Sequence, residues 1–192
     1  QNDPPQILDI SDQEMNEDSI LEIQIDAEDI DEDTLTFEAY LDNELNASLE
    51  LEGNIVTITP NNNWFGELIV NASVYDPSGL SDSQSIIVNV VPVNDPPSFI
   101  SQSITEAFED IEYSYQLEVT DPDSDSFYFY FLMNPDGMNI DSNGLITWTP
   151  GEGILSSGFV SVAAWDTQSP QSGIDYPAIQ EFEIVVSPVN DP

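Results

Sequence analysis

The 192-residue sequence contains no lysine, arginine or histidine, against 38 aspartates and glutamates, so its formal net charge is −38 at pH 7. Recognition of nucleic acids and of anionic membranes depends on cationic side chains, so neither is expected as a direct partner. Salt bridges between side chains cannot form, and repulsion among the carboxylates destabilises the compact state unless cations from solution compensate. We therefore expect bound divalent cations, and a saline habitat is a further reason for such an acidic surface.

Cysteine is also absent, which excludes disulfides and thiolate metal sites. Without histidine, cysteine or lysine, and with no nucleophile motif or glycine-rich phosphate loop, the chain is not expected to be an enzyme. A two-carboxylate glycosidase is the remaining catalytic alternative, but close carboxylate pairs carry little weight in so acidic a sequence. No apolar run approaches the roughly 18 residues of a membrane-spanning helix. The sequence begins with Gln1 rather than methionine, so we expect a segment of a longer protein.

A repeated motif divides the sequence into two halves. The tripeptide Asn-Asp-Pro begins at residues 2, 94 and 190, and the first two copies continue with a second proline. Between the copies, each half has an acidic cluster, a Thr-x-Thr-Pro segment and an aromatic-Asp pair in the same order. The repeat predicts two tandem domains, residues 1–97 and 98–192, taken from a longer array in which each unit contacts its neighbours.

Apolar residues alternate with polar ones throughout both halves, which predicts half-buried antiparallel strands packed as a sandwich. No segment shows a helical period, so the fold class is all-β. The predicted inward-facing positions are Leu21, Ile23, Ile25, Leu68, Val70, Ala72, Val74, Ile86, Val88 and Val90, then Tyr113, Tyr115, Leu117, Val119, Val160, Val162, Ala164, Phe182, Ile184 and Val186. Trp148 and Trp165 are predicted to lie in the core, Trp64 to close one end of the sandwich, and Tyr128 and Tyr130 to face outward.

The acidic clusters (Asp29, Asp31 and Asp33, then Asp121, Asp123 and Asp125) each precede a hydrophobic strand. Calcium takes six to eight oxygen ligands, several of them from carboxylates on short loops. An EF-hand is excluded, because counting from the first aspartate of each cluster places neither the required glycine nor the required glutamate. The alternative is that these aspartates only form turns. Because the clusters recur at matching places beside the same linker, we expect calcium (Ca2+).

The first half, through Ala27–Phe37, the Ile-Thr-Pro-Asn string at 58–61 and the Asn-Asp-Pro-Pro linker, resembles the bacterial cadherin-like repeats of large adhesins. The second half, through Asp121–Asp125, Asp136–Asp141 and the string Gly-Leu-Ile-Thr-Trp-Thr-Pro at 144–150, resembles the dystroglycan-type cadherin-like domain, an immunoglobulin-like relative. The resemblance covers almost the whole chain and implies two cadherin/immunoglobulin-like Greek-key sandwiches in a linear array.

In this family calcium lies at the junction between consecutive domains, so the resemblance also implies a ligand set. The implied ligands are Glu17 and Glu109, Asp29 and Asp31, Asp121 and Asp123, Asp76 and Asp166, and the linker residues Asn2, Asp3, Asn94, Asp95, Asn190 and Asp191. The Asp-Arg-Glu motif of animal cadherins is replaced by Asn-Asn-Asn at 61–63, so one or two ions at each junction are expected. Asn94 and Asp95 are the strongest candidates, because both flanking domains are present.

The predicted tandem array of domains also indicates a function. The sequence indicates a stalk or fibre segment of a prokaryotic surface protein or adhesin, located at the cell surface or in a secreted fibre, with calcium stiffening its linkers. Its expected partners are neighbouring repeats of the same array, and a homopolymeric filament is an alternative assembly. The alternative function is a ligand- or carbohydrate-binding adhesion module that uses exposed aromatic and acidic side chains.

Overall fold

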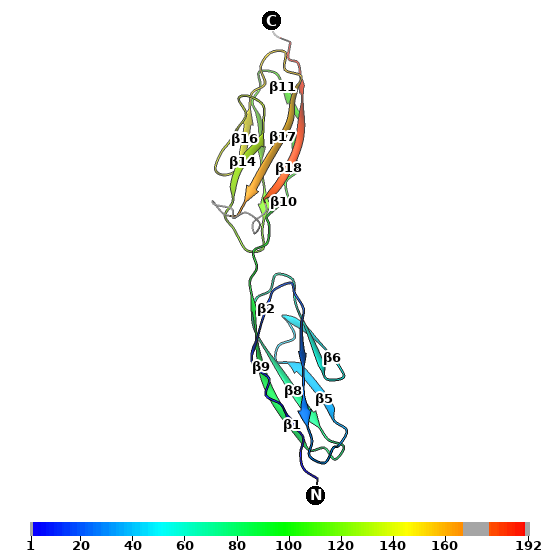
Figure 1. The fold of residues 1–192 in the computed structure, drawn as a ribbon. Helices are drawn as coiled ribbons and strands as arrows, with labels where there is room; N and C mark the ends of the chain where they lie inside the picture. The colour runs from blue at the N-terminus through cyan, green and yellow to red at the C-terminus, as the bar shows by residue number, and fades with distance from the viewer. Residues whose placement is uncertain (1, 167–176, 191–192) are drawn as a thin grey trace. The chain divides into compact units, whose positions relative to one another are not determined.

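The computed structural model describes residues 2–166 and 177–190 (Figure 1). The chain divides into two compact units, Gln1–Val93 and Asn94–Pro192, each described here by itself. The predicted division after residue 97 falls within the first few residues of the second unit. All regular structure in the described ranges is β-strand, as predicted, and no described helix is long and apolar enough to span a bilayer.

The first unit consists of three sheets built from short and long strands. Its strands are β1 (Gln6–Ile7), β2 (Gln13–Asn16), β3 (Leu21–Gln24), β4 (Ala27–Glu28), β5 (Thr36–Leu41), β6 (Ala47–Glu52), β7 (Ile55–Pro60), β8 (Gly66–Tyr75) and β9 (Ser81–Val91). A four-stranded sheet has the order β2-β9-β8-β5, a three-stranded sheet has the order β3-β7-β6, and β1 pairs with β4. All pairs are antiparallel except β2 with β9.

The second unit repeats this arrangement strand for strand. Its strands are β10 (Ser98–Phe99), β11 (Glu106–Phe108), β12 (Tyr113–Gln116), β13 (Val119–Thr120), β14 (Tyr128–Met133), β15 (Asn139–Ile140), β16 (Leu145–Trp148), β17 (Ser156–Trp165) and β18 (Ala178–Ser187). The sheet orders are β11-β18-β17-β14, β12-β16-β15 and β10-β13, and β11 pairs with β18 in parallel. The repeat seen in the sequence is therefore a repeat of one topology.

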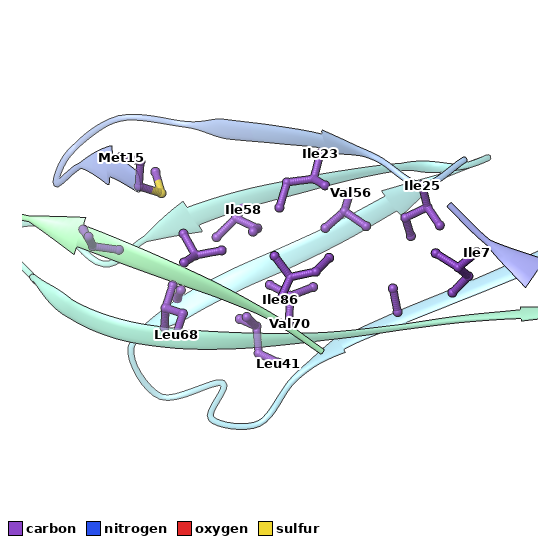
Figure 2. Packing of buried hydrophobic residues seen from close by; sticks show 14 of the residues in the cluster. Ile7, Met15, Ile23, Ile25, Leu41, Val56, Ile58, Leu68, Val70 and Ile86 are labelled. Atoms are coloured by element: carbon purple, nitrogen blue, oxygen red, sulfur yellow. The ribbon is translucent and has the colours of Figure 1, made fainter. Parts of the chain in front are cut away.

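The core of each unit lies between the four-stranded and three-stranded sheets. In the first unit Val56 and Ile58 of β7 face Val70 of β8 and Ile86 of β9, and all four are at most 1% exposed (Figure 2). Period-two alternation is sufficient to choose these positions, because successive strand residues point to opposite faces of a sheet. Every predicted inward position is buried except Leu21 and Val119, which are partly exposed.

The tryptophans have three different environments. Trp148 is 5% exposed within the second core, as predicted, and Trp64 is partly buried against the first core. The prediction that Trp165 is a core residue is wrong. On β17 the core-facing residues are Val160 and Val162, so the alternation turns Trp165 to the outer face, where its ring stacks against Tyr130.

Candidate calcium-binding ends of the two units

The linker motif that precedes each unit is hydrogen-bonded to that unit. In the first unit the Asn2 side chain donates from Nδ2 to Asp76 Oδ2 at 2.5 Å, and the backbone N–H of Asp3 donates to Asp31 Oδ2 at 2.7 Å. Asp76 follows β8, and Asp31 lies in the acidic loop after β4. The Asn-Asp pair therefore joins two loops that are far apart in sequence.

The second unit has the same two contacts at the matching residues. Asn94 Nδ2 donates to Asp166 Oδ2 at 2.7 Å, and the backbone N–H of Asp95 donates to Asp123 Oδ2 at 2.7 Å. Asp166 follows β17, the counterpart of β8. We call this end of each unit, where the Asn-Asp pair meets the acidic loop, its linker end.

Each acidic loop is organised by its first aspartate. Asp29 Oδ1 accepts the backbone N–H groups of Asp31 and Asp33 at 2.9 and 3.3 Å, which folds the loop into an Asx turn. Asp121 does the same for Asp123 and Ser124 at 2.8 and 2.9 Å. Formation of the turn therefore uses only one oxygen, Oδ1, of each of these two carboxylates.

The second oxygen of each of these carboxylates is not explained by the turn. Asp29 Oδ2 and Asp121 Oδ2 are both buried and have no hydrogen-bond partner among the described residues. A buried charged oxygen without a partner is costly, and no cationic side chain exists in this sequence to offset it. A cation from solution is the remaining means of compensation.

Three carboxylates meet at the linker end of the first unit. Oxygens of Asp29, Asp33 and Asp76 lie within 4.8 Å of one another. Burial, with repulsion from Asp29, Asp76 and Asp31, raises the pKa of Asp33 above its usual 3.8. Burial also acts to raise the pKa of Asp76, but hydrogen bonds from Asn2, Ser78 and Leu80 outweigh it and hold that pKa below 3.8.

The linker end of the second unit gathers fewer acidic groups. Asp125, at the sequence position that matches Asp33, is exposed, and Ser124 takes the second hydrogen bond of the turn. No three acidic side chains come equally close in the described part of this unit. The two linker ends thus share the linker contacts and a first aspartate whose Oδ2 has no described partner, and they differ in the third carboxylate.

The predicted glutamate ligands lie at the opposite end of each unit. Glu17 is 3% exposed, its Oε1 accepts the backbone N–H of Val93 at 2.7 Å, and its Oε2 is buried without a described partner. The backbone N–H of Glu17 donates to Val91, at the end of β9, whereas Asp76 precedes the start of that strand. The 11 residues of β9 span roughly 35 Å, so Glu17 is not brought together with the acidic loop of its own unit.

Glu109 has the matching place in the second unit. It is 3% exposed, and its two oxygens accept the N–H groups of Gly153 at 2.8 Å and Val189 at 3.3 Å. The next residues, Asp18 and Asp110, both adopt left-handed backbone conformations, with φ of 55° and 56°. We call this the far end of each unit, where the chain leaves for the next linker. Asn190 lies at this end, whereas the predicted ligand Asp191 is outside the described residues.

The donor set suits calcium, which prefers six to eight carboxylate, amide and carbonyl oxygens held by flexible loops. Asn2, Asp29, Asp33 and Asp76 would hold the ion at the first linker end, with Asp31 and Asp3 beside them. The predicted ligand set omits Asp33. In the sequence, Asp33 is marked only as the third member of an alternating triplet, and the folded loop is needed to bring its carboxylate within 4.8 Å of those of Asp29 and Asp76.

Comparison with known proteins relates the first unit to a family and the whole chain to a fold. Residues 2–89 match the model of the bacterial Ig domain, and no curated protein matches the chain. Human protocadherin-24 EC1-2 is similar over 100% of both chains, with 18% identity and a TM-score of 0.58. Drosophila N-cadherin EC1-4 is similar over 98% of this chain and 50% of its own, with 18% identity and a TM-score of 0.61. Mouse cadherin-23 EC22-24 is similar over 98% and 67%, with 18% identity and a TM-score of 0.59. Residues 2–89 therefore match the bacterial Ig domain family, and the chain as a whole shares the fold of cadherin extracellular domains.

Proposed function

We propose that this chain is a structural segment of a prokaryotic extracellular surface protein, a stalk or fibre, that calcium stiffens at its interdomain linkers. One observation carries the proposal: the linker Asn-Asp pair contacts the acidic loop and the aspartate after the long strand in the same way in both units. The extracellular assignment is supported by the bacterial Ig family match and the cadherin-type fold.

The linker residues themselves favour a stiff connection. Proline fixes its own φ and biases the residue before it toward extended backbone, and each described linker begins its prolines directly after Asp3 or Asp95. The Asn and Asp contacts hold the start of the linker against the unit that follows. When bound, calcium would supply the positive charge that this sequence lacks. That charge would offset the repulsion among the carboxylates of Asp29 and Asp76, or of Asp121 and Asp166, at each linker end.

The proposal includes the absence of catalysis. It is supported by the lack of histidine, cysteine and lysine, which leaves only carboxylates, hydroxyls and amides for chemistry. The two buried glutamates, Glu17 and Glu109, accept hydrogen bonds from backbone N–H groups and so act as structural anchors.

Small-angle X-ray scattering of the two-unit chain tests the stiffening. On titration from excess EDTA to millimolar calcium, we expect the distribution of interatomic distances to narrow and its maximum to increase. Replacing Asp166 with asparagine should shift this change to higher calcium, whereas Glu50→Gln, which removes one charge on the exposed face of β6, should not. An unchanged distribution at saturating calcium contradicts the proposal.

A further inference from the structure

The outer face of the four-stranded sheet in the second unit is aromatic. On β14, Phe129 and Phe131 pack against the core, so Tyr128 and Tyr130 point outward, and each is 39% exposed. The adjacent strand places Trp165 directly opposite Tyr128. The Tyr130 and Trp165 rings are nearly parallel, with an interplanar angle of 14° and centroids 6.4 Å apart.

The apolar surface extends across the neighbouring strands. Tyr130 is paired with Ala163 of β17, and Ala163 is paired with Ile179 of β18, which is 52% exposed. Phe159, further along β17, is 50% exposed. We call Tyr128, Tyr130, Trp165, Phe159 and Ile179 the aromatic face. Ala163 itself is fully buried and Trp165 is partly buried, so the exposed area of the aromatic face comes from Tyr128, Tyr130, Phe159 and Ile179. Grouped exposed apolar side chains mark an interaction site more often than isolated ones do.

The first unit shows that the fold does not require this face. The register that pairs Tyr128 with Trp165 pairs Thr36 with Tyr75, so Glu38 stands where the second unit has Tyr130. Ser73 lies opposite Glu38, and Asn71 lies opposite Tyr40. The same topology is thus stable with Thr36, Glu38 and Ser73 where the second unit has Tyr128, Tyr130 and Ala163, although Tyr40 and Tyr75 remain on this face. The additional aromatic residues of the second unit are therefore available for another role.

The negative charge of the chain around the aromatic face indicates which kind of partner would bind there. Glu181 and Glu183 alternate with the core residues Phe182 and Ile184, so both carboxylates lie on the same side of the sheet as Ile179. All 38 formal charges of this chain are negative, so a second copy would be repelled, whereas a basic partner would be attracted. Guanidinium and ammonium groups bind aromatic faces through cation–π attraction, and a neighbouring carboxylate adds to it.

We propose that the aromatic face binds an arginine- or lysine-bearing segment of a basic partner protein. The cationic groups would lie over the Tyr130 and Trp165 rings, with Glu181 and Glu183 on the adjoining strand. Trp165 directly precedes Asp166 of the linker end, but none of the five side chains of the aromatic face is a proposed calcium ligand, so the binding does not depend on calcium.

Isothermal titration calorimetry with a blocked peptide of alternating arginine and threonine tests the proposal. In about 150 mM salt, where long-range attraction is screened, we expect Tyr130→Ser to weaken binding about tenfold. The matched control is Tyr40→Ser, which removes an exposed tyrosine from β5 of the first unit and should leave the affinity unchanged. Both variants keep the net charge. Equal affinities of Tyr130→Ser and the wild type would overturn the proposal, because they would mean binding to the acidic surface in general.

Other occupants give different results. A peptide with glutamine in place of arginine should not bind. Binding of a neutral glucan oligosaccharide that Tyr130→Ser abolishes would replace the basic partner with a carbohydrate. A dimer in sedimentation velocity that the same substitution dissociates would replace it with a second copy. Repeating the titration in EDTA separates this proposal from the calcium proposal, since peptide binding should persist there.

Discussion

Replacing Asp29 with asparagine should have opposite effects with and without calcium. The Asp29 carboxylate lies within 4.8 Å of two others, and each such pair of unit charges costs about 1 kcal/mol in bulk water. Because salt screens part of this repulsion, we expect the substitution to raise the free energy of unfolding of the metal-free protein by roughly 1 kcal/mol. The asparagine Oδ1 can still accept the Asp31 and Asp33 N–H groups, so the turn is retained.

In calcium the same substitution removes a charged ligand. Residues that only hydrogen-bond to metal ligands already contribute about 10–100-fold to metal affinity. For a direct ligand we therefore take the loss of calcium affinity as about 100-fold. At a calcium concentration of about 100 Kd, the stabilisation of the folded first unit then falls from about 2.7 to about 0.4 kcal/mol. The variant should therefore be more stable than the wild type in EDTA and less stable in calcium.

Differential scanning calorimetry measures both conditions, and about 1 kcal/mol corresponds to a shift in Tm of about 4–8 °C for a unit of this size. Glu50→Gln is the control, because it removes one exposed charge away from the cluster and should behave alike in both buffers. A shift of Tm by Asp29→Asn in the same direction and by the same amount with and without calcium would contradict a calcium site at this carboxylate.

Two further predictions concern one unit each. Replacing Ile184, which is fully buried in the second core, with alanine should lower the free energy of unfolding of the second unit by about 2–5 kcal/mol. Calorimetry should show that only one of the two unfolding transitions moves, and this transition is then assigned to the second unit. Because the folded pKa of Asp76 lies below 3.8, its ionised form stabilises the first unit above about pH 4, and this contribution is lost as the pH falls through the folded value. Asn2→Ala removes one of the hydrogen bonds that lower this pKa, so carbon-13 NMR titration should place the Asp76 pKa closer to 3.8; an unchanged value would contradict the linker contact.

The sequence is sufficient to predict most of the fold, because two-residue periodicity and the duplicated linker motif are local features of the chain. Leu68 to Val74 are buried at alternate positions as the pattern requires. The prediction for Trp165 is wrong although the periodicity was sufficient to place it: along β17, Trp165 has the parity of Phe159, which is 50% exposed, and not that of the core residue Val162. Residue type favoured the core, whereas strand parity decided the outcome.

The candidate site could be predicted only in part. The acidic loops and linkers were evident from composition, and the structure brings Asn2 and Asp76 together across 74 residues of sequence. Sequence could not separate the two ends of a unit, since the position of Glu17 relative to Asp29 depends on the length and direction of β9. Nor could it distinguish Asp33 from Asp125, because whether the third aspartate points into the cluster depends on the turn that each loop adopts.

Thermal unfolding of the unmodified chain with and without calcium tests whether calcium binds and stabilises the folded units. A ligand that binds only the folded state stabilises it by about 2.7 kcal/mol at 100 times its Kd. We predict a Tm higher by about 10 °C or more in excess calcium than in excess EDTA. Magnesium at the same ionic strength should give a smaller shift, because it requires stricter octahedral geometry and retains its water. Equal Tm values in calcium and EDTA would contradict the claim.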